Sequence, residues 1–190
     1  MLLFFDTETS GLPRRWNAPT SDLANWPRLV QLGWVLVSPD GQEQARSCRL
    51  VKPDGFTISY GATRQHGIST EYALRHGEPL SDVLAEFNSA LENATQVIGH
   101  NVSFDLNIVG AELLRQGWVN ALVTRSALCT MREGTDYCQL PGRYGYKWPT
   151  LTELHVKLFG TEFDSAHDAL ADTEACMRCY FELKKKRVLN

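Results

Sequence analysis

The hydrophobic positions of the chain form short apolar runs near its start and helical patterns further on. MLLFF at residues 1–5 and LVQLGWVLVS at 29–38 are typical of buried strands, and PDG at 39–41 predicts a tight turn. QEQARSCRLV at 42–51 then forms the hairpin partner of the second strand. Three strands therefore open the predicted fold.

The rest of the chain alternates between helical and strand patterns. Apolar residues at helical spacing predict a helix over 80–91, and Thr150 with Glu153 forms a capping box for a helix that Gly160 ends. The other expected elements are helices over 58–65 and 69–75, a strand over 95–99, a helix from HNVSFDL to about residue 117, a strand over 122–129, a loop over 134–148 and a final helix over about 168–186. This order predicts an α/β fold with a mixed sheet of about five strands and helices on both faces.

Two carboxylates at the end of the first apolar run need an explanation. Side chains alternate along a strand, so Asp6 and Glu8 point to one side and Thr7 to the other. Two acids about 7 Å apart on one strand face repel each other unless a cation lies between them. The opening DTE therefore suggests a metal site.

Composition limits the class of protein. With 190 residues, 43% of them hydrophobic, the chain fits one globular domain, which we expect to span residues 1–190. Five cysteines without a paired spacing favour a reducing, cytoplasmic environment. We find no targeting segment and no apolar run long enough for a membrane span, so we expect no membrane partner.

The net charge of −3 at first argues against a nucleic-acid partner. If four carboxylates hold metal, however, the remaining charge is −3 + 4 = +1, and two divalent cations would neutralise the four acids. Local basic clusters then matter more than the total.

Two further stretches carry acids or histidine next to predicted helices. IGHNVSFDLNIV places Asp105 in a first helical turn, and SAHDALADTEAC places His167 before the last helix and Asp172 within it. Each has an ordinary explanation alone, since acids favour helix N-termini and histidines are common in loops. The small residues around Asp172 leave room for another group to approach.

Together, DTETSG, HNVSFD and HDALADT resemble the DEDDh 3′→5′ exonucleases, the group that includes ribonuclease T, oligoribonuclease and the proofreading subunits of bacterial replicases. The three motifs occur in the family's order and span nearly the whole chain. QHGIS and KWPTLTELHVKLFG are also similar to stretches of this family. The resemblance implies a ribonuclease H-like fold and release of nucleoside 5′-monophosphates from the 3′ end.

The resemblance also implies a set of catalytic residues. Asp6 would bridge two metals, Glu8 and Asp172 would complete the first, Asp105 would support the second, and His167 would act as general base. Oxygen donors suit hard cations, so two Mg²⁺ (or Mn²⁺) ions are expected rather than zinc.

The expected substrate is the 3′ end of single-stranded DNA or RNA, with DNA favoured. By resemblance, the segment from Thr7 to Thr9 would hold the terminal nucleotide, His66 and Ile68 would contact the last base and sugar, and Asn101 and Phe104 would lie near the next nucleotide. Core packing is an equally good account of Phe104. RYGYKW, at residues 143–148, mixes basic and aromatic residues as a single-strand platform would.

Three alternatives remain open at this point. The catalytic residues fit an RNA-trimming exonuclease equally well, because they do not distinguish the two sugars. A proofreading subunit that needs a polymerase partner is the second, and a catalytically silent nucleic-acid-binding domain is the third. The sequence also leaves open whether the chain forms a homodimer.

Overall fold

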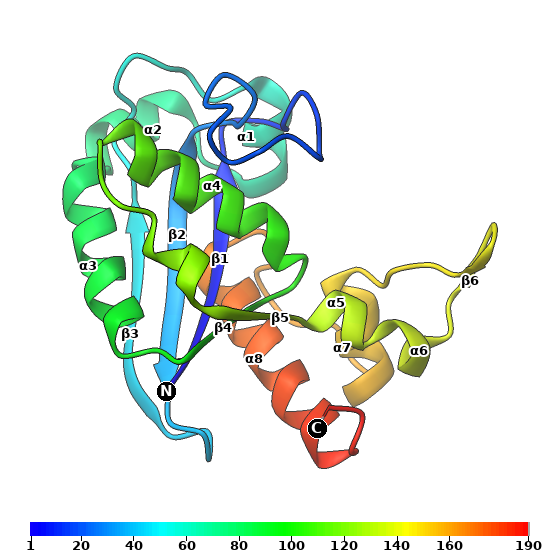
Figure 1. The fold of residues 1–190 in the computed structure, drawn as a ribbon. Coiled ribbons are helices and arrows are strands. Elements are labelled where there is room, and N and C mark those ends of the chain that lie inside the picture. The colour runs from blue at the N-terminus through cyan, green and yellow to red at the C-terminus, as the bar shows by residue number, and fades with distance from the viewer. Residues whose placement is uncertain (190) are drawn as a thin grey trace.

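The computed structural model describes residues 1–189 and is built on a five-stranded mixed sheet with the strand order β3-β2-β1-β4-β5 (Figure 1). β1 pairs antiparallel with β2 and parallel with β4, and β4 pairs parallel with β5. The strands are β1 (Leu2–Thr9), β2 (Leu29–Val37), β3 (Glu43–Leu50), β4 (Gln96–Gly99) and β5 (Ser126–Cys129).

Helices cover both faces of the sheet (Figure 1). The helices are α1 (Tyr60–His66), α2 (Thr70–His76), α3 (Leu80–Glu92), α4 (Val102–Arg115), α5 (Thr130–Glu133), α6 (Thr135–Cys138), α7 (Leu151–Phe159) and α8 (Ala169–Lys185), with a short 3₁₀ helix at Ala121–Thr124. The predicted fold class is confirmed, as is the capping box of Thr150 and Glu153 at the start of α7.

Alternation along β1 divides the core into two layers. Leu3 and Phe5 pack with α3 and α4, and Leu2 and Phe4 pack with α7 and α8. All four side chains are buried because β1 is the central strand of the sheet. The carboxyl end of β1 therefore emerges between two helical layers.

Two of the expected boundaries were wrong. The strand expected over 122–129 contains only Ser126–Cys129, because the preceding residues form the 3₁₀ helix. The loop expected over 134–148 contains α6 and a small hairpin of β6 (Pro141–Gly142) and β7 (Gly145–Tyr146). None of the helices within residues 1–189 combines the length and apolar character that crossing a bilayer requires.

Candidate active site

Asp6 and Glu8 lie at the carboxyl end of β1, on the face of the sheet that α8 covers. Leu2 and Phe4 precede them on that face and pack with α8. Thr7 points to the opposite face, where its hydroxyl reaches α4. The predicted alternation is therefore confirmed. A register irregularity directly after Glu8 interrupts the pairing of β1 with β2, as bulges beside active sites often do.

Asp105 reaches the same place from the other face of the sheet. It is buried in the first turn of α4, where the helix N-terminus favours negative charge. Its Oδ1 accepts a hydrogen bond from the Thr7 hydroxyl at 2.7 Å and another from the Thr7 backbone N–H at 3.1 Å. Because Thr7 lies between Asp6 and Glu8, these bonds hold the Asp105 carboxylate next to the β1 acids.

The N-terminus of α8 brings Asp172 to the same point. Asp168 caps the helix by accepting two backbone N–H groups of the first turn. Gln31 on β2 fixes this cap: its Nε2 donates to Asp168 at 3.0 Å and its Oε1 accepts the Ala169 N–H at 3.1 Å. The start of α8 is thus tied directly to the strand next to β1.

His167 occupies a left-handed backbone conformation, with φ of 73°, immediately before α8. This turn lets its backbone N–H donate to Asp172 Oδ2 at 3.2 Å. The Gln65 Nε2 atom of α1 lies 3.0 Å from His167 Nδ1 and 2.8 Å from Nε2. The exposed imidazole is therefore held between α1 and α8, beside the acids.

Burial and mutual repulsion make the acids hard to ionise. Burial is the largest cause of the raised pKa in each of the four acids. The pKa of Asp6 is raised well above its ordinary value, and the negative charges of Asp105, Asp172 and Glu8 add to the effect of burial. The pKa rises to about 8 for Glu8, about 7 for Asp105 and about 6 for Asp172. For Asp105 the Thr7 hydroxyl partly offsets the effect of burial.

The donor set fits a hard divalent cation. Glu8, His167 and Asp172 each offer one ligand atom, and these atoms lie within 4.8 Å of one another. Asp172 Oδ1 is buried and has no hydrogen-bond partner among residues 1–189. An unpartnered carboxylate oxygen facing further acids is costly unless a cation compensates it. The site is thus one that Mg²⁺ or Mn²⁺ could occupy.

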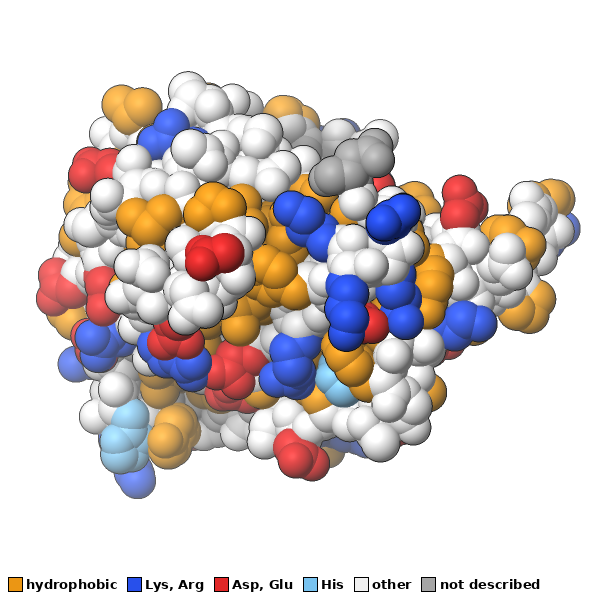
Figure 2. Space-filling model, turned by 90° about the horizontal axis from the view of Figure 1, so that it is seen from below, with side chains coloured by type: hydrophobic (Ala, Val, Ile, Leu, Met, Phe, Trp, Pro, Cys, Tyr) orange, Lys and Arg blue, Asp and Glu red, His pale blue; other side chains and the backbone are white. Residues whose placement is uncertain are grey.

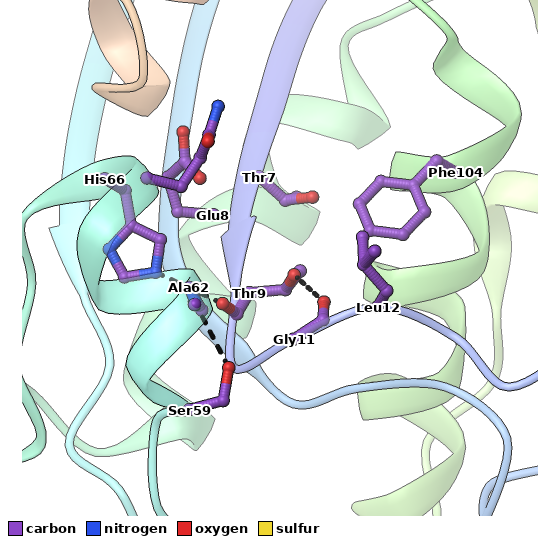
Figure 3. A pocket seen from close by; sticks show the side chains of 11 residues that line it. Thr7, Glu8, Thr9, Gly11, Leu12, Ser59, Ala62, His66 and Phe104 are labelled. Carbon is purple, nitrogen blue, oxygen red and sulfur yellow. Dashed lines mark hydrogen bonds between the residues drawn. The ribbon is translucent and has the colours of Figure 1, made fainter.

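A cavity of about 610 Å³ adjoins the acids (Figure 3). Thr7, Thr9, His66 and Phe104, all expected to contact substrate, line it together with Glu8. Figure 3 shows His66 on one side, and Phe104 with Leu12 on the other. Gln65, the first residue of the QHGIS stretch, also lines the cavity, as do Leu12 and Ser59, which the sequence-based prediction did not include.

His66 links α1 to the end of β1. Its Nδ1 accepts the Ile68 N–H at 3.1 Å, so Nε2 carries the proton and donates to the Thr9 carbonyl oxygen at 3.2 Å. Burial lowers the pKa of His66, which favours this neutral form. One wall of the cavity is thereby fixed to the strand that carries Asp6 and Glu8.

Two of the expected substrate contacts do not line the cavity. Ile68 is only 9% exposed and packs with Val30, Ile58 and Ala73, so in this conformation it is a core residue. Asn101 lies at the N-cap of α4 in a left-handed conformation, with φ of 67°, outside the lining.

Phe104 combines two roles that the sequence could not separate. It packs partly against the core and also lines the cavity, with its ring centroid 5.7 Å from that of the exposed Trp16. Trp16 belongs to the loop after β1, which therefore forms an aromatic rim beside the cavity.

Comparisons with known proteins identify the fold and the family. The fold matches that of Escherichia coli exonuclease I in complex with a dT13 oligonucleotide, with a TM-score of 0.76, 22% identity, and coverage of 98% of this chain and 41% of that chain. A zinc-bound exonuclease I–ssDNA complex from E. coli matches with a TM-score of 0.76, 21% identity, and coverage of 98% and 41%. The chain thus spans about two-fifths of the length of these proteins. No curated protein matches the sequence significantly.

These matches identify the architecture as the ribonuclease H-like α/β fold, here with a cluster of acids at the carboxyl end of its central strand. Residues 3–180 match the family model of the RNase T type, which is described as an exonuclease. The match covers nearly the whole chain and includes all three acidic motifs. The chain belongs to this exonuclease family.

Proposed function

We propose that this chain is a metal-dependent 3′→5′ exonuclease that hydrolyses single-stranded DNA and releases nucleoside 5′-monophosphates. The observation that carries the proposal is the meeting of Asp6, Glu8, Asp105 and Asp172 beside His167, at the mouth of a cavity of about 610 Å³. Family membership supports the reaction class, and the dT13 complex of exonuclease I favours DNA as the substrate.

The four acids are the proposed ligands of two divalent cations, Mg²⁺ or Mn²⁺. When bound, such a pair stabilises both the attacking and the leaving oxygen of a phosphodiester. Asp6 and Glu8 contribute from β1, Asp172 from α8 and Asp105 from α4. Thr7 orients Asp105 through two hydrogen bonds, and the His167 backbone N–H orients Asp172.

His167 is the proposed general base. Its imidazole is exposed beside Glu8 and Asp172, so one ring nitrogen can accept a proton from water at the scissile phosphate. Gln65 contacts the ring from α1 and restricts its orientation. The base is thus presented by a short turn whose position depends on two separate helices.

The cavity is the proposed site of the 3′-terminal nucleotide. Thr7 and Thr9 would contact its sugar, His66 forms one wall, and the rings of Phe104 and Trp16 offer an apolar surface on which an unpaired base can stack. Leu12 lies exposed on the same side and adds to this apolar surface.

The test uses two oligonucleotides of one sequence, DNA and RNA, each labelled at the 5′ end. We expect a ladder that shortens from the 3′ end with Mg²⁺ or Mn²⁺, no ladder with EDTA or with Asp172→Ala, and faster digestion of DNA. Faster digestion of RNA would reassign the substrate. Absence of cleavage for both, with strand binding retained, would make the chain a binding domain or a partner-dependent proofreader.

A further inference from the structure

A small hairpin leaves the body of the protein between α6 and α7. This segment, residues 141–148, is here called the arm; it contains β6, β7 and a two-residue tip of Arg143 and Tyr144. Figure 1 shows the arm extending away from the sheet, and Figure 2 shows the same projection at the right of the molecule, with hydrophobic and basic side chains at its end.

The arm carries three exposed aromatic side chains within five residues. Tyr144 is 89% exposed, Tyr146 51% and Trp148 59%. Neighbouring guanidinium groups lie over two of the rings, with Arg143 5.1 Å from the centre of Tyr144 and Arg132 5.9 Å from that of Trp148. Large rings clustered on a projecting hairpin do not pack in the hydrophobic core of this domain, so they indicate an interaction surface.

The charge of the arm is opposite to that of the whole chain. The sequence from Tyr137 to Thr152 contains Arg143 and Lys147 and no acidic residue, whereas the chain carries a net charge of −3. Lys147 pairs with Glu153 at 2.5 Å, which leaves Arg143 as the basic group at the tip. Basic groups interleaved with exposed rings suit a polyanion that carries flat bases.

The root of the arm is fixed near the acids. His100 Nε2 donates to the Pro149 carbonyl oxygen at 2.9 Å, and burial lowers the pKa of His100 to about 4, so the ring stays neutral near neutral pH. His100 directly follows the carboxyl end of β4, which pairs in parallel with β1, and Asp6 and Glu8 lie at the carboxyl end of β1. The root of the arm is therefore attached at the end of the sheet where the carboxyl ends of β1 and β4 lie, which is also the end that carries the acids.

We propose that the arm is a second contact site for single-stranded nucleic acid, which it holds upstream of the 3′ end in the cavity. Tyr144, Tyr146 and Trp148 would stack on bases, and Arg143 would contact the phosphate backbone. This inference rests on the proposed function, since a strand must enter the cavity by its 3′ end for the arm to meet its upstream part.

The test compares strands of increasing length, from a trinucleotide upward, with the whole chain. Binding is measured in EDTA, where no cleavage occurs, and turnover is measured with Mg²⁺. For wild type we expect affinity to rise steeply once the strand is long enough to reach the arm. For Arg143→Ala/Tyr144→Ala we expect about tenfold weaker binding of long strands, unchanged trinucleotide turnover, and a salt slope smaller by about 0.7.

The matched control is Tyr72→Ala/Arg75→Ala, which removes the same residue types from the exposed surface of α2. It should bind every strand like wild type. The role of the arm would be overturned if both double variants lost the same affinity for long strands, or if the affinity of wild type did not depend on strand length. Neither result would contradict the proposed exonuclease function. A change in sedimentation of the arm variant, with unchanged strand binding, would assign the surface to a protein contact instead. If wild type neither cleaves nor binds any strand, the proposed function itself fails.

Discussion

Gly33 and Ala169 lie backbone against backbone where α8 meets β2. A Cβ atom on Gly33 would lie 2.4 Å from the carbonyl carbon of Ala169. Gly33 is also the β2 partner of Asp6 in the sheet register, and its carbonyl oxygen accepts the Thr173 hydroxyl at 3.1 Å. Only a residue without a side chain lets α8 approach closely enough to bring Asp172 to Asp6.

Gly33→Ala should therefore damage both stability and the metal site. The added methyl group meets backbone that cannot rotate away, so α8 must shift, at a cost of about 1–3 kcal/mol in unfolding free energy. The same shift should weaken Mn²⁺ binding. Urea unfolding and calorimetric titration with Mn²⁺ measure the two effects.

Gly61→Ala is the control for stability. No atom lies within 4 Å of a Cβ built on Gly61, which is in α1, so this change should leave stability equal or slightly higher. If Gly33→Ala were as stable as wild type and bound Mn²⁺ equally well, the close approach of α8 would have no role in building the site.

Asp172→Ala should abolish metal-dependent cleavage without lowering the stability of the metal-free protein. The change removes one like charge from the cluster together with a buried oxygen that lacks a partner among the described residues, 1–189. Oligonucleotide digestion and thermal unfolding in EDTA are the measurements. Glu174→Ala on the same helix is the matched control, because its exposed pair with Arg46 should contribute no more than about 1 kcal/mol. Normal turnover in Asp172→Ala would contradict the metal site.

The metal-free protein should lose stability as the pH rises. In the unfolded chain these carboxyls have pKa values near about 4, whereas in the folded chain those of Asp172, Asp105 and Glu8 are about 6, 7 and 8. Between the unfolded and folded pKa values the folded state binds more protons, so the unfolding free energy falls as the pH rises from about 4 through about 8. Urea unfolding across this range in EDTA tests the sign.

Divalent cations should oppose this loss. They bind the ionised carboxylates of the folded state, so the stabilisation by Mg²⁺ should grow as the pH rises. Asp6→Asn/Glu8→Gln removes two of the titrating groups and should flatten the pH dependence in EDTA. Rising stability with pH in EDTA would show that the pKa values of these acids are not raised in the folded state.

The acids of the site were predictable from the sequence because each lies in a motif with its own local context. Asp6 and Glu8 follow an apolar strand, and Asp105 and Asp172 each lie in a helix whose pattern is evident. The sheet and the two helical layers then have few ways to pack, which also explains why the fold class was predictable.

The polar residues that position the acids were not predictable in the same way. Gln31 contacts Asp168 across 137 positions, and Gln65 contacts His167 across 102. A glutamine in a strand or a helix carries no local signal of such a contact, which depends on how two elements pack. The burial of Ile68 was not predictable for a similar reason, since it depends on α2 packing against β2.

His167→Ala should reduce turnover by about a hundredfold or more while leaving metal affinity largely unchanged, as expected for loss of a general base. Single-turnover cleavage rates and calorimetric titration with Mn²⁺ separate the two properties. The control is His76→Ala, which removes an exposed histidine at the end of α2 and should leave both properties unchanged. A collapse of Mn²⁺ affinity in His167→Ala would make His167 a ligand, in line with its distance from Glu8 and Asp172.

Thr7→Val should shift metal binding to higher pH. The Thr7 hydroxyl donates to Asp105 at 2.7 Å and partly offsets the effect of burial, which raises the pKa of Asp105 to about 7. Valine keeps the shape but not the donor, and a hydrogen bond to a charged group contributes about 1.5 kcal/mol or more. The pKa of Asp105 should therefore rise by about one unit, so Mn²⁺ affinity near neutral pH should fall.

Thr7→Ser is the matched comparison, because it retains the hydroxyl and loses only a methyl group. Calorimetric titration with Mn²⁺ from about pH 6 to 9 should give a midpoint about one unit higher for Thr7→Val and an unchanged midpoint for Thr7→Ser. If both variants bound less Mn²⁺ at every pH, Thr7 would act through packing of β1 against α4. If neither variant differed from wild type, the backbone N–H of Thr7 would be sufficient to hold Asp105 in its ionised form.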